Sequence, residues 1–198
     1  RFGYLFQGAA LFDSLTVYEN VAFGLRQNTT MPEPEIRDVV VNRLRDVGLN
    51  ANVCEKKPAQ LSGGMQQRTA IARALANTPD VLLMDEPFGA LDAQTRAMMQ
   101  ENLLQIWSDV GSTVVFITHD IDEAIFLADR IMVMSASPGR NVREFAVDLP
   151  RPRKFEITMD PAFAALKREC LELIRMESMR AFEQQAEMAA KKSDLGDF

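Results

Sequence analysis

Residues 81–86 read Val-Leu-Leu-Met-Asp-Glu, a continuous apolar run that ends in two acids. Four consecutive apolar residues between polar ones are typical of a strand that is buried on both faces of a parallel sheet. Ligands of such sheets bind at the carboxyl ends of the strands, which is where the two acids lie. Asp85 offers carboxylate oxygens to Mg²⁺, and Glu86 can orient or deprotonate a water molecule. Two acids after a strand also commonly cap the next helix, so this pair alone leaves both roles open.

Predicted strands and helices alternate along the chain on both sides of this run. Apolar residues recur at helical spacing over Ala93–Val110, and a second buried strand, Thr113–Ile117, follows. A capping box of Thr16 with Glu19 starts the first helix. Short links between the elements indicate an α/β domain with a mainly parallel sheet. The other expected strands are Gly3–Phe6, Ile131–Ser135 and Asn141–Val147, and the other expected helices start at Pro32, Ser62, Ile121 and Asp160, the last running to about Ala190 before a frayed tail, Lys191–Phe198.

The composition narrows the class of protein. The chain has 198 residues, a net charge of −6 and 47% hydrophobic residues, which is ordinary for a globular domain and excludes disorder over most of its length. No apolar stretch approaches the roughly 20 residues of a transmembrane helix. The acidic balance argues against a nucleic-acid partner, which requires a surplus of Lys and Arg. Cys54 and Cys170, with a single His, cannot form a zinc site, and we expect two free buried thiols, with a disulfide between them as the alternative.

Polar residues at three other points extend the candidate site. His119, the only histidine, follows the strand Thr113–Ile117 and is expected at the same sheet edge as Asp85. Ser62-Gly63-Gly64 precedes a helix, where a capping hydroxyl, an open backbone and free amides suit an anion. Gln7 follows the first strand. Each of these features alone has a simpler interpretation, as an ordinary loop residue or a plain helix cap.

The order and spacing of these features resemble the nucleotide-binding subunit of an ABC transporter. Gln7 matches the Q-loop, the strand with its two acids matches Walker B, and His119 matches the switch histidine. The signature motif is matched by Leu61–Arg68, with Met65 where the commonest form has Gln, and the D-loop is matched by Ala90-Leu91-Asp92. The resemblance implies a P-loop NTPase-like fold: a mainly parallel sheet, present in part, with a helical ABC signature subdomain.

The resemblance also implies a domain organisation. Residues 1–7 and 79–149 would form a partial ATPase core, residues 8–78 the helical signature subdomain and residues 150–198 a C-terminal helical extension. We expect the last helix to pack on its own domain, with a regulatory or dimer-stabilising role as the alternatives.

ATP and Mg²⁺ are the ligands that the resemblance implies. Glu86 would be the general base or water-orienting residue, and Asp85 would support Mg²⁺. His119 would contact the γ-phosphate, and Gln7 would reach both Mg²⁺ and the attacking water. In the family two ATPase subunits pair head to tail, so that the signature motif of one completes the site of the other. The residues implied on that side of the nucleotide are Ser62, Gly63, Gly64, Gln66 and Asp92.

One motif of the family is not found in the chain. The Walker A loop, G-x-x-x-x-G-K-[ST], cradles the phosphates, yet no Gly here is followed by Lys. In the family this loop and the aromatic residue that stacks on adenine precede the Q-loop, and we expect both upstream of Arg1, the chain being N-terminally truncated. The chain as given is therefore expected to bind Mg-ATP poorly and to hydrolyse almost none. The alternative, a non-catalytic subunit that supplies only a signature helix, is disfavoured by the intact Glu86 and His119.

Different segments resemble different transporters. The segments similar to the nitrate, sulfonate and taurine importers are Asp85–Arg96, Thr118–Ala124, Ser137–Arg140 and Pro150–Arg153. Gly8–Phe23 is more similar to ATPases of phospholipid-trafficking systems. The larger number of matches favours the importer group. Soluble ABC ATPases of DNA repair or translation carry coiled-coil inserts, zinc modules or tandem copies, and none is visible in this sequence.

The implied partners are a second ATPase subunit, transmembrane permease subunits and, for an importer, an extracytoplasmic solute-binding protein. The implied location is the cytoplasmic face of the inner membrane, with no nucleic acid bound. In the family the helical subdomain receives a coupling helix of the permease. The candidates for that contact are Ala9, Leu11, Phe12 and Leu15, for which ordinary core positions are the alternative.

Overall fold

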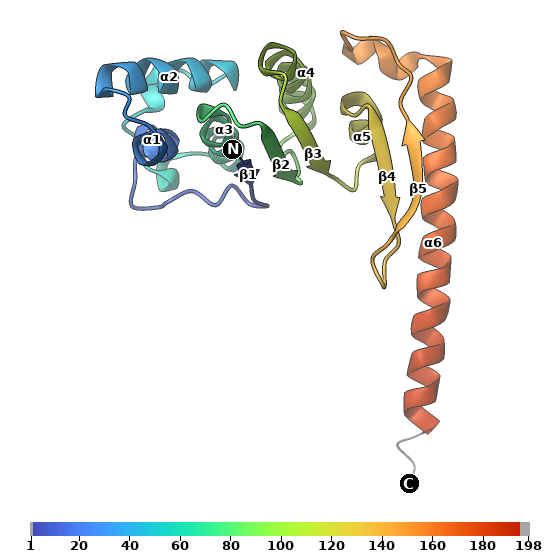
Figure 1. Ribbon diagram of the computed structural model, residues 1–198. Coiled ribbons are helices and arrows are strands. Elements are labelled where there is room, and N and C mark those ends of the chain that lie inside the picture. The colour runs from blue at the N-terminus through green and yellow to red at the C-terminus, as the bar shows by residue number, and fades with distance from the viewer. Residues whose placement is uncertain (1, 195–198) are drawn as a thin grey trace. The chain divides into compact units, whose positions relative to one another are not determined.

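The structure, a computed structural model, describes residues 2–194 and divides into two compact units, residues 1–119 and 120–198 (Figure 1). The first unit contains, in chain order, β1 (Phe2–Leu5), α1 (Val17–Asn28), α2 (Glu33–Asp46), the 3₁₀ helices Ala51–Val53 and Pro58–Gln60, α3 (Gly63–Ala76), β2 (Val81–Asp85), α4 (Ala93–Val110) and β3 (Thr113–Ile117). The second unit contains α5 (Ile121–Leu127), β4 (Arg130–Met134), β5 (Asn141–Ala146), the 3₁₀ helix Phe155–Met159 and α6 (Pro161–Asp194). The expected division into residues 1–7 with 79–149, 8–78 and 150–198 stays a prediction.

A parallel sheet in the order β1-β2-β3 forms the centre of the first unit, as the alternation of strands and helices predicts. Tyr4 pairs with Leu83, and Leu83 pairs with Val115, so equivalent positions of the three strands form one row across the sheet. Because side chains alternate between the faces of a strand, each row lies on one face. The residues that follow the three strands consequently meet at one edge of the sheet.

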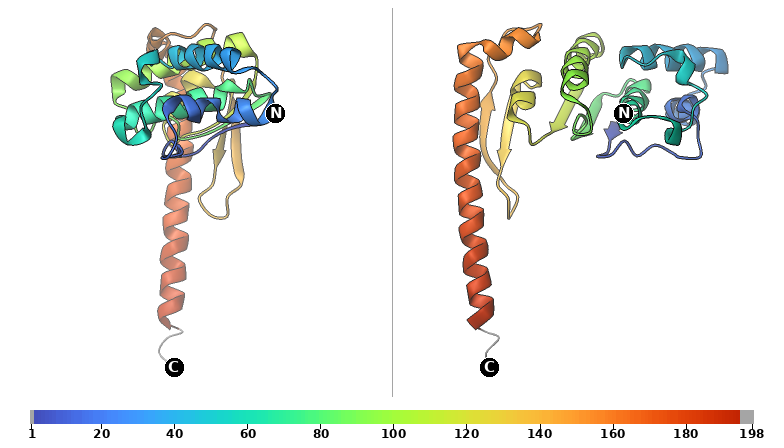
Figure 2. Two further views of the ribbon diagram at one scale, coloured as in Figure 1. Left: turned by 90° about the vertical axis from the view of Figure 1, so that its left-hand side faces the viewer. Right: turned by 180° about the vertical axis from the view of Figure 1, so that it is seen from behind.

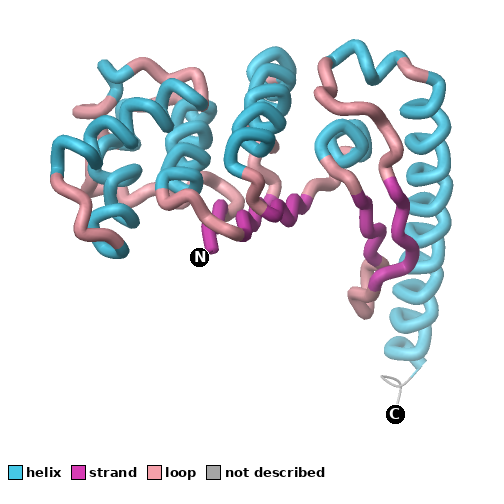
Figure 3. The backbone as a smooth tube through the Cα atoms, turned by 45° about the horizontal axis from the view of Figure 1, so that its top comes forward, coloured by secondary structure: helices cyan, strands magenta, loops and turns pink. Residues whose placement is uncertain are grey.

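The two faces of this sheet differ in exposure. α3 and α4 lie along one face of the sheet (Figure 3). Leu82 and Met84 point to one face of β2 and are buried, and a Cβ on the paired Gly3 would meet both Leu82 and the backbone of Ala74 in α3, so this is the face that α3 covers. On the opposite face the side chains of Phe2 and Ile117 are 79% and 56% exposed. The prediction that residues 81–84 are buried on both faces is therefore wrong for the part of the chain that the structure describes, because Leu83 is only half-buried.

α1 and α2 pack on α3 and have the predicted local structure. The amide of Thr16 donates to the Glu19 carboxylate at 2.7 Å, and the Thr16 hydroxyl accepts from the Glu19 amide at 3.2 Å, which confirms the capping box. These bonds hold the pKa of Glu19 below its usual range, because they stabilise the carboxylate. Apolar residues recur in α2 at helical spacing, and Ile36, Val40 and Leu44 on that face are buried.

In the second unit, β4 and β5 form an antiparallel hairpin of their own. The sequence predicts Ile131–Ser135 and Asn141–Val147 as further strands of a mainly parallel sheet, but within the described residues these two strands pair with each other. The reason is that the short turn at Ser137-Pro138-Gly139 returns the chain directly alongside β4, which only antiparallel pairing allows. Val133 of β4 and Phe145 of β5 pack with Cys170 of α6, along which the hairpin lies in Figure 2.

α6 ends at Asp194, so residues 191–194 of the predicted frayed tail are helical. Residues 195–198 of that tail lie outside the described residues. No helix in the described part of the chain is long and apolar enough to cross a membrane. Cys54 and Cys170 are both free and buried, as predicted, and burial raises the pKa of both thiols because the thiolates would lose hydration.

Arg153 is the buried charge that joins the elements of the second unit. Its guanidinium donates to five carbonyl oxygens at 2.7–3.3 Å. These are the carbonyls of Ile125, Phe126, Ala128, Val147 and Leu149. The last carbonyls of a helix have no helical partner, so one side chain satisfies the end of α5 and also binds the segment after β5.

Arg153→Met is expected to lower the free energy of unfolding by about 2–4 kcal/mol, because it leaves several buried carbonyls without a donor. Urea denaturation of the whole chain, followed by a probe in the second unit, measures the loss of unfolding free energy. Arg130→Met is the matched control: it removes an exposed ion pair with Glu144 (2.7 Å) and should cost less than about 1 kcal/mol. Equal losses in the two variants would contradict this role for Arg153.

Candidate functional site

Three side chains that follow β1, β2 and β3 meet at the carboxyl edge of the parallel sheet. Gln7 Nε2 donates to Glu86 Oε2 at 3.1 Å, and His119 Nδ1 lies 3.0 Å from Glu86 Oε1. The prediction that His119 and the acids after β2 share one edge is confirmed, and Gln7 joins them. Both oxygens of the Glu86 carboxylate are thus engaged, each by a different neighbouring strand end.

Glu86 is held in a strained backbone conformation. Its φ of +45° lies in the left-handed region, which costs a residue other than glycine about 1–2 kcal/mol. Its amide donates to the carbonyl of Ile117 at 2.9 Å, and its carbonyl accepts from the amide of Gly89 at 3.2 Å. These bonds join the strained residue to β3 and to the turn that follows. Strain of this kind clusters at functional sites, where the surroundings enforce it.

The contact with Glu86 determines which nitrogen of His119 carries a proton. A carboxylate only accepts hydrogen bonds, so Nδ1 is the protonated donor in this contact. The Nε2 atom is then left for another partner, and it can donate only when the imidazole is charged. The His119 side chain is 77% exposed whereas that of Glu86 is 30% exposed, so the imidazole is the outer member of the pair.

Asp85 is the candidate metal ligand. It is half-buried at the end of β2, and no hydrogen-bond or ion-pair partner holds its carboxylate within the described residues. In that same part of the chain no three His, Cys, Asp or Glu residues gather into a group that could hold a metal ion. Mg²⁺ is commonly bound by one or two carboxylates together with waters and substrate phosphates. Asp85 therefore fits Mg²⁺ held jointly with a nucleotide, rather than in a site made wholly of protein ligands.

The predicted signature residues form the start of α3. The Ser62 hydroxyl accepts from the amide of Met65 at 3.3 Å, which confirms the predicted helix cap. A Cβ on Gly63 would meet nothing within 4 Å, so the first turn of the helix is open to a ligand. A Cβ on Gly64 would lie only 3.3 Å from Leu91, so glycine allows α3 to approach the turn before α4. Free amides at a helix N-terminus suit an anion.

Two other predicted ligands of the nucleotide have partners within the chain. Asp92 caps α4 by accepting from the amide of Thr95 at 3.0 Å, and its pKa is held below its usual range by the bonds to Thr95. Gln66 donates from its side-chain amide to the carbonyl of Pro58 at 2.9 Å. Both side chains thus have structural roles here, and their contact with a nucleotide stays a prediction.

The sequence interpretation missed two side chains that hold the loop after Gln7. Asn20 is fully buried and binds Phe12 in both directions, accepting from its amide at 2.8 Å and donating to its carbonyl at 3.1 Å. Arg73 of α3 donates to two carbonyls of the same loop. The signals that could have found them are an Asn and an Arg within otherwise apolar stretches of predicted helices.

The four apolar candidates for a permease contact fall into different environments. Ala9 is buried, whereas Leu11 and Leu15 are half-buried. Phe12 is 45% exposed, and its ring centroid lies 4.9 Å from that of Phe23, which is also exposed. Ala9 is thus a core residue, and the Phe12–Phe23 pair is the apolar surface next to the loop.

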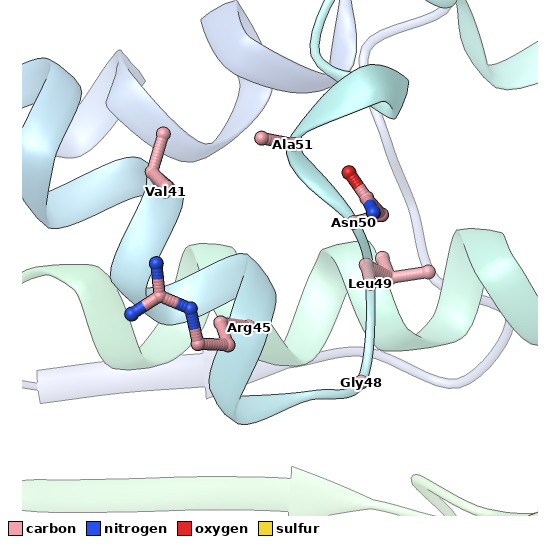
Figure 4. Close-up of a pocket in the computed structure, with 6 residues that line it drawn as sticks. All are labelled: Val41, Arg45, Gly48, Leu49, Asn50 and Ala51. Carbon is pink, nitrogen blue, oxygen red and sulfur yellow. The ribbon is translucent and has the colours of Figure 1, made fainter.

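One pocket in the first unit is formed by other residues. It is lined by the end of α2 and the segment that follows, and no predicted site residue takes part (Figure 4). The lining residues are Val41, Arg45, Gly48, Leu49, Asn50 and Ala51.

Fold and site together define an ATP-binding cassette. Gln7, Glu86 and His119 lie at the carboxyl edge of a parallel sheet, and the glycine-rich start of α3 lies in the helical part that follows β1. The ABC transporter family matches residues 1–89. An ATP-binding protein of Brucella abortus is 52% identical over 83% of this chain and 63% of its own length. The bicarbonate transport ATP-binding protein CmpD of Synechococcus elongatus is 49% identical over 86% of this chain and 62% of its own. The chain belongs to the ABC transporter family, as an ATP-binding domain.

Solved structures support the same assignment. The ATP-binding cassette MJ0796, in a dimeric post-hydrolysis state with ADP and phosphate, has a TM-score of 0.68 and 37% identity over 76% of this chain and 64% of that one. CbiO1 of Clostridium perfringens, part of the transporter complex cbiONQ, has a TM-score of 0.66 and 30% identity over 91% of this chain and 67% of that one. The chain thus spans somewhat less than two thirds of the length of the curated relatives, 62–63% in the two cases above.

The strain at residue 86 predicts an inverted order of stability for two substitutions. Glu86→Gly should be more stable than Glu86→Ala by about 1 kcal/mol, because only glycine adopts the left-handed conformation at no steric cost. At Asp38, exposed within α2, the ordinary order should hold, with Ala more stable than Gly by about 1 kcal/mol. Urea midpoints of the four variants measure both differences. Ala more stable than Gly at both positions would contradict the strained backbone.

Proposed function

We propose that the protein containing this chain is the ATP-hydrolysing subunit that powers an ABC transporter. The observation that carries the proposal is the Glu86 carboxylate at the sheet edge, bonded to Gln7 at 3.1 Å and His119 at 3.0 Å. A carboxylate poised between two polar side chains beside a free Asp suits an in-line attack by water on a phosphate, where positioning and charge stabilisation do most of the work.

Each residue of the cluster has a chemical role in that reaction. Asp85 would hold Mg²⁺, which neutralises developing phosphate charge when bound. Glu86 would orient the attacking water and accept its proton, after exchanging its contact with Gln7 for one with the water. His119 would donate from Nε2 to the terminal phosphate while Nδ1 stays on Glu86. Gln7 would hold the attacking water through its side-chain amide and would help to hold Mg²⁺ through its amide oxygen.

The phosphate-binding loop is proposed to lie in polypeptide outside this chain. The motif is absent from the sequence, and the face of the parallel sheet with exposed Phe2 and Ile117 is of the kind that parallel sheets ordinarily bury. A further strand and helix that carry the loop would cover this face. We therefore expect the 198-residue chain alone to bind Mg-ATP weakly and to hydrolyse almost none.

A second ATPase subunit would complete the nucleotide site. The open first turn of α3 at Gly63 offers free amides to the γ-phosphate of an ATP held by the other subunit. Asp92, exposed at the start of α4, would work across the same interface. The similarity to a dimeric cassette with ADP and phosphate supports this pairing.

The proposed transporter is an importer of a small oxyanion or sulfonate, with permease subunits and an extracytoplasmic binding protein, and the ATPase at the cytoplasmic face. The importer-like segments and the similarity to bicarbonate transport proteins support this class. The exposed pair Phe12 and Phe23 would receive a coupling helix of the permease. ATP hydrolysis by the full-length subunit, reconstituted with its permease and binding protein, should be stimulated by bicarbonate, nitrate or taurine. Stimulation of ATP hydrolysis by phospholipid alone would overturn the importer class.

In the full-length protein, Glu86→Gln should lower ATP turnover by about 10²–10⁴-fold while ATP binding is retained, because the amide cannot accept the proton of the water. Phosphate release and equilibrium binding of labelled ATP measure the two quantities. Glu35→Gln, a matched change at an exposed position of α2, should leave both unchanged. Wild-type turnover in Glu86→Gln would contradict the role of Glu86. Robust Mg-dependent turnover by the 198-residue chain alone would contradict the proposed location of the phosphate loop.

A further inference from the structure

The loop after Gln7 has a backbone shape that it cannot hold by itself. Gly8, Ala9 and Ala10 have φ angles of +81°, +66° and +45°, and two of these three residues are not glycine. Within the run, the amide of Ala10 donates to the carbonyl of Gly8 at 2.8 Å. Consecutive left-handed alanines persist only where surrounding contacts impose them. The loop therefore depends on a partner from another element.

Arg73 of α3 is that partner. Its Nη1 donates to the carbonyl of Ala10 at 2.9 Å and its Nη2 to the carbonyl of Ala9 at 3.1 Å. The centre of the guanidinium lies 5.8 Å from the ring centroid of Phe12, so three residues of the loop contact one side chain. Because the guanidinium fork is planar and rigid, its two bonds fix the directions of both carbonyls together.

The environment of Arg73 makes this contact its main interaction. The side chain is half-buried, and its pKa is lowered by the loss of hydration alone. Its partners in the described part of the chain are carbonyl oxygens and an aromatic ring, with no carboxylate among them. Removing a charge from water without an opposite charge is unfavourable, so the carbonyls of Ala9 and Ala10 are what stabilise the guanidinium there.

We propose that Arg73 is a positioning residue for ATP hydrolysis, which acts on Gln7 through the loop and touches no nucleotide itself. α3 starts at Gly63, and Arg73 lies about 15 Å further along the same helix. The single helix α3 thus carries both the signature glycines and the Arg73 guanidinium, which holds the loop that follows Gln7. A shift of α3 displaces Ala9 and Ala10, and with them the amide that bonds Glu86. This inference rests on the proposed function.

The first test is hydrogen exchange of the nucleotide-free full-length protein. Arg73→Lys keeps the charge but not the fork, so exchange at the Ala10 amide should become about tenfold faster. The Phe12 amide is held by Asn20 and should change less than about threefold. Arg68→Lys is the matched control, since Arg68 is half-buried on α3 and donates to the carbonyl of Gly48 at 2.9 Å; exchange at Ala10 should stay unchanged. Unchanged exchange at Ala10 in Arg73→Lys overturns the inference.

The second test is a double-mutant cycle with Gln7→Ala, read as steady-state ATP hydrolysis. Arg73→Lys should lower kcat about tenfold and change KM for ATP less than about twofold. In the Gln7→Ala background the same change should lower kcat less than about twofold, because the two residues act on one step. A full tenfold loss in both backgrounds would mean that Arg73 only supports the fold, and it would overturn the inference. If Arg73→Lys does not fold, Arg73→Gln, which keeps an amide donor, is carried through the same cycle.

The two tests separate this inference from the function on which it rests. Wild-type protein that hydrolyses no ATP contradicts the proposed function and, with it, the catalytic part of the inference. Normal hydrolysis with unchanged exchange at Ala10 contradicts the inference alone.

Discussion

The parallel register of β1, β2 and β3 is the constraint on which the candidate site depends. Leu5 pairs with Met84 and Met84 with Phe116, so the three strands end at neighbouring positions along one edge of the sheet. A slip of one residue in any strand would turn its side chains to the other face and would separate the polar groups that follow. The contacts of Gln7 and His119 with the two oxygens of Glu86 therefore exist because an apolar pattern sets the register.

Strained backbone and helix caps position the polar groups at the edge of the parallel sheet and at the starts of α3 and α4. Left-handed backbone at residues other than glycine occurs at Thr78, at Glu86 and in the loop after Gln7, and the last two places adjoin the candidate site. In each of these two places other elements impose the conformation: bonds to Ile117 and Gly89 at Glu86, and the Arg73 fork at the loop. The helix caps formed by Ser62 and Asp92 position the other group of predicted nucleotide ligands.

Much of the fold and site follows from local rules in the sequence. The capping box at Thr16, the cap at Ser62, the apolar face of α2 and the parallel sheet are set by residues close in sequence or by strong periodicity. Each feature that could not be predicted depends on the partner that an element or side chain finds in the fold. The hairpin of β4 with β5 required knowing which strands pair. Arg153 looks like a surface residue until the carbonyls around it are in place, and the φ of Glu86 depends on bonds to β3 and to the next turn.

The exposed face of the parallel sheet is another feature on which the sequence pattern and the structure differ. The run at residues 81–84 has the composition of a strand covered on both sides, yet Leu83 remains half-buried in the described structure. The strand and helix proposed above to carry the phosphate loop would cover this face, and the chain spans 62–63% of the length of two of its relatives.

The central claim is that this sheet edge is where ATP is hydrolysed. The most direct measurement is a crystal structure of the full-length protein with Mg²⁺ and a non-hydrolysable ATP analogue. The account predicts the terminal phosphate beside His119, the metal ion next to Asp85, and the Glu86 carboxylate turned toward a water in line with that phosphate. A nucleotide bound elsewhere, with Glu86 still bridging Gln7 and His119, would contradict it.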